Sequence, residues 1–328
     1  MGGVERVVYA LVRALQEQGH EVTLLAEDTS QPPEGVEFVG IGTYWHQEHT
    51  VQRVWRHLVR EGGQYDVIHN HGRLLYWVPR VWGRAAKVHT FHFGELQVPQ
   101  VRKFLGLRPR RFAFAPCGQW IADRYRQLGG RWHPVHNGLL HGQFEPNFHV
   151  GPDAPFVCIG RMDQRKGIPE SIEIVKRAGR RLIIAGVIGD QPHEKEWFQR
   201  NVLDHCDGEQ IRFIGPVDDR RKQDLLANAA GLLLPIQGSE AFTVVMIEAL
   251  ACGCPVIGLN RYCIPELLRD GVNGILAEDL DEMVRKLPAL ERIDRRACRR
   301  DFEDRFSAGT MARSYLSLYN ELLGHEGD

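Results

Sequence analysis

The stretch "GLLLPIQGSEAFTVVMIEALACGCPVIGL" (231–259) decides the fold class. Its two apolar runs, 231–236 and 255–259, are predicted to be buried β-strands, because their hydrophobic residues do not alternate with polar ones. The segment between them has helical periodicity, with Val244 and Ile247 on its apolar face. A strand, a helix and a second strand in this order indicate one unit of a parallel sheet.

The same alternation of apolar runs and helical patterns continues along the whole chain. The clearest helix is predicted at 4–18, and Gly19 would end it. A segment rich in Gly, Pro and Asp, 141–155, interrupts the pattern and is interpreted as an interdomain linker. The sequence therefore predicts two doubly wound, Rossmann-like domains. The remaining predicted strands are 21–26, 36–41, 66–70, 87–91, 111–115, 133–137, 156–160, 181–186, 211–215 and 274–277.

Composition limits the class of protein. A length of 328 residues suits two domains, and a formal net charge of −1 argues against a nucleic-acid-binding protein. The seven cysteines are irregularly spaced, which argues against a disulfide framework and favours a reducing cytoplasm. No apolar run has the length of a membrane span. We therefore expect a cytoplasmic protein.

The loop "CIGRMDQRKG" (158–167) places the cations Arg161 and Lys166 between two glycines. Arg161 and Lys166 follow a predicted strand and precede a predicted helix, and Gly160 and Gly167 flank them. Such a pair suits a phosphate or a diphosphate, and the alternative, which is the more frequent one for an Arg and a Lys on a loop, is a solvated surface. The dinucleotide fingerprint GxGxxG is absent, which disfavours a dehydrogenase.

Two carboxylates follow the strand at 231–236. Glu240 lies in the loop after that strand, and Glu248 lies inside a mostly apolar helix, where a carboxylate needs a partner. Hydroxyl groups of a ribose or a sugar would serve, and the N-terminus of the same helix would attract an anion. Alternatively, Glu240 caps the helix and Glu248 is one half of a buried salt bridge.

Three motifs, "GRMDQRKG", "SEAFTVVMIEALACGCPVI" and "CIPELLRDGVNGIL", closely resemble the retaining glycosyltransferases of family 4, which have the GT-B fold. The first half resembles them in "GGVERVV", "YDVIHNH", "VHTFHFG" and "PVHNG", and "FSAGTMARSYLSLYNELL" is similar to their C-terminal helix. The resemblance implies an acceptor domain at 1–148 and a donor domain at 149–306. It also implies a C-terminal helix at 307–328 that packs back toward the first domain.

The resemblance also implies roles for individual residues. Arg161 and Lys166 would clamp the diphosphate of a nucleotide-sugar donor, such as a UDP- or GDP-sugar, beside Gly160. Glu240 would contact the transferred sugar, and Glu248 would contact the ribose. The backbone N–H groups that would reach the sugar or phosphate are those of Phe242, Thr243 and Val244.

The first domain would contribute a histidine and a glycine turn. By the resemblance, His92 faces the transferred sugar, and Gly2 and Gly3 close over the diphosphate or meet the acceptor. The reaction implied is hexosyl transfer with retention of anomeric configuration. No cofactor or metal is expected, because fixed cations and a helix N-terminus can stabilise the leaving diphosphate, and no convincing metal-ligand spacing occurs.

Two features depart from the family pattern. Thr243 stands where the family usually has glycine, and its hydroxyl would be able to donate to phosphate. More seriously, the family begins with a strand that runs into the turn at Gly2 and Gly3, and here that strand is missing. A gap is therefore expected in the first sheet, with unpaired backbone groups at its edges. A misassigned start, a trimmed chain and an inactive paralogue are the three explanations.

The acceptor is not specified and would be a sugar, a lipid or a small molecule. The basic stretch "VRKFLGLRPRR" (101–111) would either make a weak peripheral contact with the inner membrane or form a solvated loop. Two other functions stay open. One is a non-catalytic sugar-nucleotide-binding protein with a degenerate first domain, and the other is a GT-B-fold nucleotide-sugar epimerase.

Overall fold

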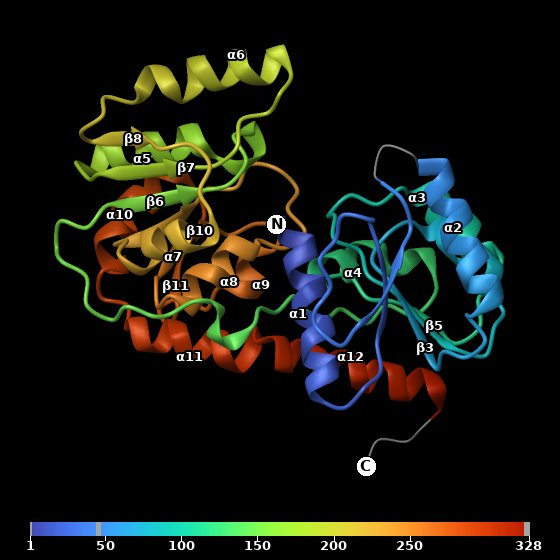
Figure 1. Ribbon diagram of the computed structural model, residues 1–328. Coiled ribbons are helices and arrows are strands. Elements are labelled where there is room, and N and C mark those ends of the chain that lie inside the picture. The colour runs from blue at the N-terminus through green and yellow to red at the C-terminus, as the bar shows by residue number, and fades with distance from the viewer. Residues whose placement is uncertain (1, 44–46, 325–328) are drawn as a thin grey trace. The chain divides into compact units, whose positions relative to one another are not determined.

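The computed structural model describes residues 2–43 and 47–324 and divides them into two compact units (Figure 1). The first comprises the residues up to Leu140 together with those from Ser307 onward, and the second is His141–Phe306. The second unit begins eight residues before the boundary predicted at 148/149. The reason is local, since Phe144 is buried and its carbonyl oxygen accepts a 2.7 Å hydrogen bond from Nη1 of Arg299.

The second unit is built on a six-stranded sheet in the order β11-β10-β9-β6-β7-β8. Every pairing within it is parallel, which confirms the interpretation of its apolar runs as buried parallel strands. Strands β9 and β10 are buried at every position. The strands are β6 (Phe156–Ile159), β7 (Leu182–Ala185), β8 (Ile211–Phe213), β9 (Gly231–Leu234), β10 (Val256–Leu259) and β11 (Gly274–Ala277).

Helices pack on this sheet through apolar stripes. Ile172 and Val175 of α5 join Met283 and Leu287 of α10 and the sheet residue Ile184 in one hydrophobic core. Pro169 in its first turn favours the start of α5, and a left-handed Gly179 ends it. The helices are α5 (Ile168–Ala178), α6 (Pro192–Asn201), α7 (Asp219–Ala227), α8 (Val244–Ala251), α9 (Ile264–Leu267), α10 (Leu280–Leu290) and α11 (Arg295–Arg305).

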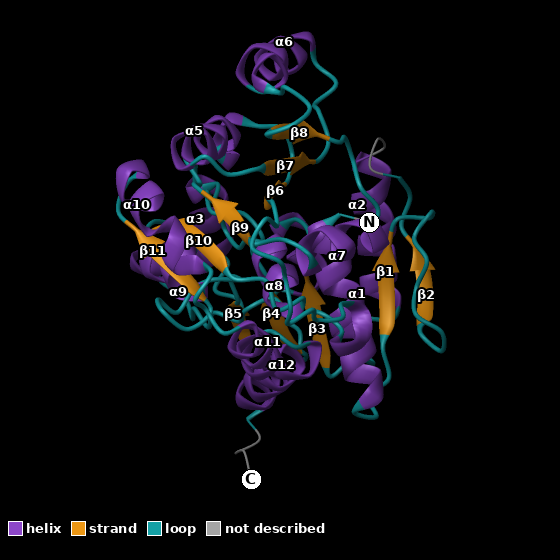
Figure 2. Cartoon of the chain, turned by 90° about the vertical axis from the view of Figure 1, so that its left-hand side faces the viewer, coloured by secondary structure: helices purple, strands orange, loops and turns teal. Residues whose placement is uncertain are grey.

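The first unit contains two separate parallel sheets, β1-β2 and β3-β4-β5. Among the described residues, β1 pairs only with β2 and β3 pairs only with β4. Both β1 and β3 line one cavity, so the predicted gap in the first sheet is present (Figure 2). The strands are β1 (Thr23–Ala26), β2 (Glu37–Gly40), β3 (Val67–Asn70), β4 (Ala86–His89) and β5 (Phe112–Phe114).

The last helix belongs to the first unit, where α12 packs on α1 and on β4. The hydroxyl groups of Tyr315 and Thr90 lie 2.9 Å apart, and the Tyr319 hydroxyl lies 2.6 Å from Nδ1 of His69. These contacts tie the end of the chain to the β3-β4-β5 sheet. The helices are α1 (Gly3–Glu17), α2 (Gln47–Arg60), α3 (Val98–Gly106), α4 (Gln119–Tyr125) and α12 (Ala308–Leu323).

One predicted strand is wrong. Residues 133–137 form no strand, and their neighbour Trp132 makes only an isolated bridge to Phe114. The backbone N–H groups of His133 and Val135 still bond to Phe114 and Pro116, at 2.8 and 3.0 Å. Pro116, on the β5 side, has no N–H with which to return a bond to this segment, so the ladder does not continue beyond the bridge at Trp132.

Candidate functional site

Two loops at the carboxyl ends of neighbouring strands are locked together in the second unit. One follows β6 and the other follows β9, and these two strands pair in the sheet. Gly167 has φ +71°, and a Cβ atom there would lie 1.9 Å from the carbonyl oxygen of Pro235. Only glycine permits this approach. The carbonyl oxygen of Arg165 accepts hydrogen bonds from the N–H groups of Gln237 and Gly238, at 2.8 and 3.2 Å.

This junction brings together two of the residues predicted for the site. Nζ of Lys166 donates to Oε2 of Glu240 at 2.6 Å. Both side chains keep contact with solvent, with 29% and 21% of their surfaces exposed. A cation and a carboxylate are therefore held in one accessible place beside the loop that leads into α8.

Arg161 is held differently. Its Nη2 donates to Oε1 of Glu194 at 2.6 Å, and among the described residues it contacts Glu194 and not Glu240. Glu194 and Gln191 form a capping box at the start of α6. The pKa of the Glu194 carboxyl is lowered, first by the N–H of Gln191 and then by Arg161. In this structure Arg161 is thus tethered to α6 by a residue that the sequence analysis did not single out.

Glu248 has a buried cationic partner. Only 3% of its side chain is exposed, and Nζ of Lys222, on α7, donates to its Oε1 at 2.6 Å. Lys222 is itself 14% exposed and lies above the ring of Phe144. The sequence allowed a buried salt bridge for Glu248 but did not identify Lys222. The available signal was a lysine in the helix just before β9, the strand that leads to Glu240 and Glu248.

The N-terminus of α8 lies between these acids in the sequence. Phe242 and Thr243 are buried, whereas Val244 and Val245 are partly exposed. The first N–H groups of a helix have no partner within the helix, so this tip can receive an acceptor. The Thr243 hydroxyl is 3.4 Å from Sγ of Cys263 in a buried contact. The hydroxyl therefore has a buried partner in this structure, and its donation to a phosphate stays a prediction.

The cysteines near this helix are packing residues. Cys252, Cys254 and Cys263 are fully buried. Burial raises the pKa of the Cys254 thiol to about 11 and that of Cys263 to about 12. Within residues 2–43 and 47–324, no three His, Cys, Asp or Glu side chains are grouped so that they would hold a metal ion.

His92 lies in the first unit, in the segment that follows β4. Its Nε2 is 3.0 Å from Nδ1 of His71, and the two rings are stacked. Burial lowers the pKa of His92 to about 4, and burial together with neighbouring histidines lowers the pKa of His69 to about 3. At neutral pH these imidazoles are therefore uncharged.

The glycine turn belongs to the same unit. Gly2 is the N-cap of α1 and has extended backbone angles, φ −72° and ψ 172°, and Gly3 is the first residue of the helix. Both glycines are exposed. The roles assigned to Gly2, Gly3 and His92 stay predictions.

The basic stretch 101–111 spans the end of α3 and the loop after it. Val101 and Phe104 are buried in the core of the first unit, while Arg102 and Lys103 are exposed. Across the described residues, no helix combines the length and apolarity needed to cross a membrane. A peripheral membrane contact through 101–111 stays a prediction.

Parallel sheets with charged side chains in the loops after their strands define a Rossmann-like class of ligand-binding protein. Comparison with known families agrees with this class. The family described as "Glycosyl transferases group 1" matches residues 154–291, and "Glycosyltransferase Family 4" matches residues 1–139. The chain belongs to glycosyltransferase family 4 and is a glycosyltransferase.

Named relatives include two bacterial proteins. A phosphatidyl-myo-inositol mannosyltransferase of Mycobacterium leprae is 28% identical over 326 residues, covering 89% of this chain and 84% of the relative. An uncharacterized 41.2 kDa protein in the cps region of Klebsiella pneumoniae is 28% identical over 167 residues. That second match covers 49% of this chain and less than half, 44%, of the relative.

Solved structures share the fold. A sucrose-phosphate synthase of Thermosynechococcus elongatus superposes with a TM-score of 0.77 at 20% identity, covering 99% of this chain and 94% of the other. HepE of Anabaena, solved with UDP and glucose, gives a TM-score of 0.73 at 16% identity, covering 96% and 95% of the two chains. At these identities the likeness establishes the GT-B fold alone.

Proposed function

We propose that this glycosyltransferase moves a hexose from a nucleotide-diphosphate sugar to an acceptor, with retention of configuration and without a metal ion. The contact that carries the proposal is the 2.6 Å pair of Lys166 and Glu240 beside the tip of α8. An ammonium group can neutralise a phosphate, and a carboxylate can accept hydrogen bonds from sugar hydroxyls. Both groups are partly exposed, so a donor that enters can take up these contacts.

Names of similar proteins support the choice of donor. HepE was solved with UDP and glucose, which favours a uridine nucleotide over a guanosine or adenosine nucleotide. The relative from Mycobacterium leprae is named a mannosyltransferase, which favours a hexose. The acceptor is a sugar, a lipid or a small molecule, and the exposed basic side chains of 101–111 offer a surface for an anionic membrane.

The second unit would stabilise the leaving group. As the bond between the sugar carbon and the phosphate oxygen breaks, negative charge grows on the diphosphate. Lys166, Arg161 released from Glu194, and the N–H groups at the start of α8 would stabilise that charge beside Gly160. Glu248, which accepts a hydrogen bond from Lys222, would also accept hydrogen bonds from the ribose hydroxyls.

Retention requires that the new bond forms on the face that the leaving group vacates. We expect a front-face route in which an oxygen of the leaving diphosphate accepts the proton of the acceptor hydroxyl. The acceptor oxygen then bonds to the anomeric carbon from the same side. Neutral His92 would hydrogen-bond the sugar from the first unit, and Gly2 and Gly3 would lie against the diphosphate or the acceptor.

A binding panel tests this proposal. UDP, GDP, ADP and their sugars are titrated against the protein by calorimetry, and one nucleoside diphosphate is expected to bind. Lys166→Ala should weaken that binding at least tenfold, because it removes the ammonium nearest the proposed diphosphate. Lys176→Ala is the matched control, since Lys176 is an exposed lysine on α5 of the same unit.

Two results would contradict the proposal. One is that no nucleotide binds, and the other is that Lys166→Ala and Lys176→Ala behave alike. Once an acceptor is found, the anomeric configuration of the product by NMR tests retention. Activity that survives exhaustive treatment with EDTA tests metal independence.

A further inference from the structure

Two histidines that follow neighbouring strands of the first unit contact each other. His71 comes directly after β3, and His92 lies shortly after the end of β4. Since β3 and β4 pair in parallel, their carboxyl ends lie at the same edge of the sheet. Nδ1 of His71 is 3.0 Å from Nε2 of His92, and the centroids of the two stacked rings are 5.3 Å apart. The proposed function uses His92 and leaves His71 without a role.

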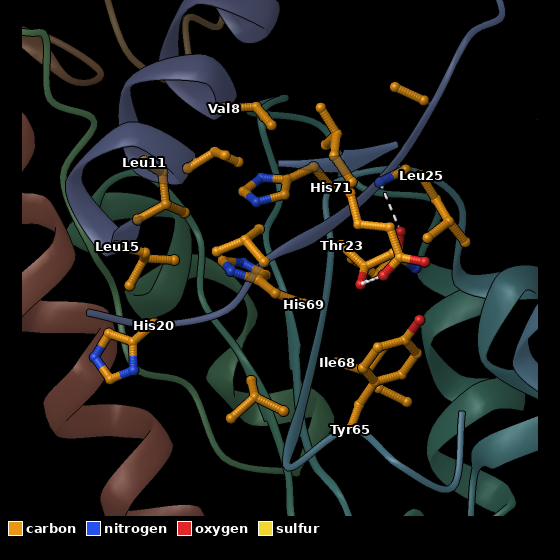
Figure 3. Close-up of a pocket in the computed structure, with 18 of the residues that line it drawn as sticks. Val8, Leu11, Leu15, His20, Thr23, Leu25, Tyr65, Ile68, His69 and His71 are labelled. Carbon is orange, nitrogen blue, oxygen red and sulfur yellow. Dashed lines mark hydrogen bonds between the residues drawn. The ribbon is translucent and has the colours of Figure 1, made fainter. Parts of the chain in front are cut away.

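The ring of His71 is supported by a third histidine, His69 of β3. The two side chains lie next to each other in the wall of one cavity, with ring centroids 4.1 Å apart (Figure 3). Both ring nitrogens of His69 are engaged, Nδ1 with the Tyr319 hydroxyl at 2.6 Å and Nε2 with the Thr90 hydroxyl at 2.7 Å. His69 is therefore held at two points and gives His71 a fixed surface to pack on.

The imidazoles of His71 and His92 are both uncharged at neutral pH. Burial lowers the pKa of His92 to about 4, and burial together with neighbouring histidines holds the pKa of His71 well below its usual range. A neutral imidazole has one N–H donor and one acceptor nitrogen. The hydrogen bond that one nitrogen makes decides which of the two carries the proton. In the 3.0 Å contact, one ring must therefore donate and the other must accept.

This contact permits only two arrangements of the protons. If Nε2–H of His92 donates to Nδ1 of His71, both rings carry their proton on Nε2. If Nδ1–H of His71 donates to Nε2 of His92, both rings carry their proton on Nδ1. Any other combination places two protons or two lone pairs between the rings. The two tautomers are therefore matched, and His71 decides whether the other nitrogen of His92, Nδ1, accepts or donates.

We propose that His71 is a positioning residue that orients the ring of His92 and fixes its tautomer. The proposal rests on the proposed function, in which His92 hydrogen-bonds the transferred sugar from the first unit. A ring that is already oriented presents Nδ1 to the sugar in one direction and with one hydrogen-bonding role, so neither a rotation nor a proton shift accompanies binding. Sugar hydroxyls both donate and accept, so either matched tautomer can serve.

NMR of the histidine side chains tests the coupling directly, because the protonated and unprotonated ring nitrogens of a neutral imidazole have well-separated nitrogen-15 shifts. The protein is labelled with nitrogen-15 histidine and studied near neutral pH, and His71→Phe and His92→Gln assign the two rings. The parent should show a single tautomer at His92 and the same tautomer at His71. In His71→Phe, which keeps a ring against His69, the shifts of His92 should move toward the average of the two tautomers.

Two further variants complete the NMR test. His71→Asn should restore a single tautomer at His92, because its side-chain amide offers a donor and an acceptor near the position of Nδ1. His20→Phe is the matched control and should leave the His92 signals unchanged, since His20 is an exposed histidine of the same unit. Unlike tautomers on His71 and His92 in the parent would overturn the proposal. So would a His92 spectrum that is the same in the parent and in His71→Phe.

The binding of the donor gives a second readout. The ratio of the dissociation constants of the preferred nucleotide and of its sugar conjugate, both measured by calorimetry, reports the contacts made with the sugar. His71→Phe should lower the advantage of the conjugate about fivefold, the worth of one neutral hydrogen bond, and leave binding of the nucleotide alone unchanged. An equal loss for both ligands would overturn the positioning role. The NMR test uses no nucleotide, so its failure is distinct from failure of the proposed function, which nucleotide binding to the parent decides.

Discussion

Replacing Lys222 with methionine should destabilise the second unit strongly. Methionine has a volume close to that of lysine, so the change removes a charge and leaves little cavity. Glu248 would then be 97% buried with its strongest cationic contact gone, since 3% of its side chain is exposed in the present structure. The carboxylate must either stay charged in an apolar helix or take up a proton, and both are costly.

The expected cost follows from the burial of the pair. Removing one partner of a buried ion pair costs about 3–5 kcal/mol. Lys222 keeps 14% of its surface exposed, so water can partly replace it, and the lower end of about 3 kcal/mol applies. For a unit of 166 residues (141–306), each kcal/mol shifts Tm by roughly 2–4 °C. Lys222→Met should therefore lower the Tm of the second unit by about 6–12 °C.

Calorimetry measures the shift, and peptide-resolved hydrogen exchange assigns it to the second unit. The control is Arg200→Met, which breaks an exposed pair with Glu196 and should cost less than about 1 kcal/mol. The double variant Lys222→Met with Glu248→Leu should recover most of the loss, because no buried charge remains. A Tm for Lys222→Met within 2 °C of the parent would refute the reasoning, as would a double variant less stable than Lys222→Met alone.

The same variant also probes the proposed donor site. If Glu248 binds the ribose, Lys222→Met should weaken binding of the preferred nucleotide about tenfold. The loss should be much smaller for the matching 2′,3′-dideoxy nucleotide, which lacks the hydroxyls. Lys222→Arg should restore part of the affinity, because it restores the charge. An equal loss for both nucleotides would assign Lys222 a role in folding only.

Two further perturbations follow from the structure. Gly167→Ala should destabilise the second unit by more than about 2 kcal/mol and abolish nucleotide binding, because its Cβ would lie 1.9 Å from the carbonyl oxygen of Pro235. The control Gly179→Ala, which is also at positive φ but in open space, should cost about 1 kcal/mol. Similar melting curves for the two variants would contradict this reasoning. The first unit should lose stability in acid, because burial holds the pKa of His69 at about 3 and that of His92 at about 4, below the unfolded value of 6.5. Below pH 6.5 the unfolded chain therefore binds more protons than the folded chain. The Tm of the first unit should be constant above about pH 6.5 and fall toward pH 4. A His92→Gln variant should show a shallower fall, measured by calorimetry from pH 8 to pH 4, and an unchanged profile would refute this assignment.

The sequence was sufficient to predict the fold class because the burial of a strand determines the pattern of apolar and polar residues along it. Strands covered on both faces have no polar alternation, and this is why 231–236 and 255–259 were recognised. The glycine-flanked loop after β6 was also recognised from the sequence. The failed strand at 133–137 shows the limit of the pattern, since its partner residue Pro116 cannot donate to the ladder and the local sequence of 133–137 does not reveal this.

The partners of the site residues were less accessible to sequence reasoning. Lys222 and Glu248 are 26 positions apart and meet only because α7 and α8 pack together. Arg161 meets Glu194 across 33 positions. The sequence also did not indicate that the Thr243 hydroxyl lies 3.4 Å from Sγ of Cys263, a residue 20 positions later. Local pattern predicts which residues are unusual, and tertiary packing decides what they touch.

The assignment of α12 to the first unit has a consequence for biosynthesis. Tyr315 and Tyr319 are buried there and bond to residues of β3 and the β4 end, more than 200 positions earlier in the chain. The first unit therefore cannot complete its interior until α12 has been synthesised. The second unit is continuous in sequence, so all of its residues are made before those of α12. The later-encoded half of this enzyme is thus the one that is free to fold first.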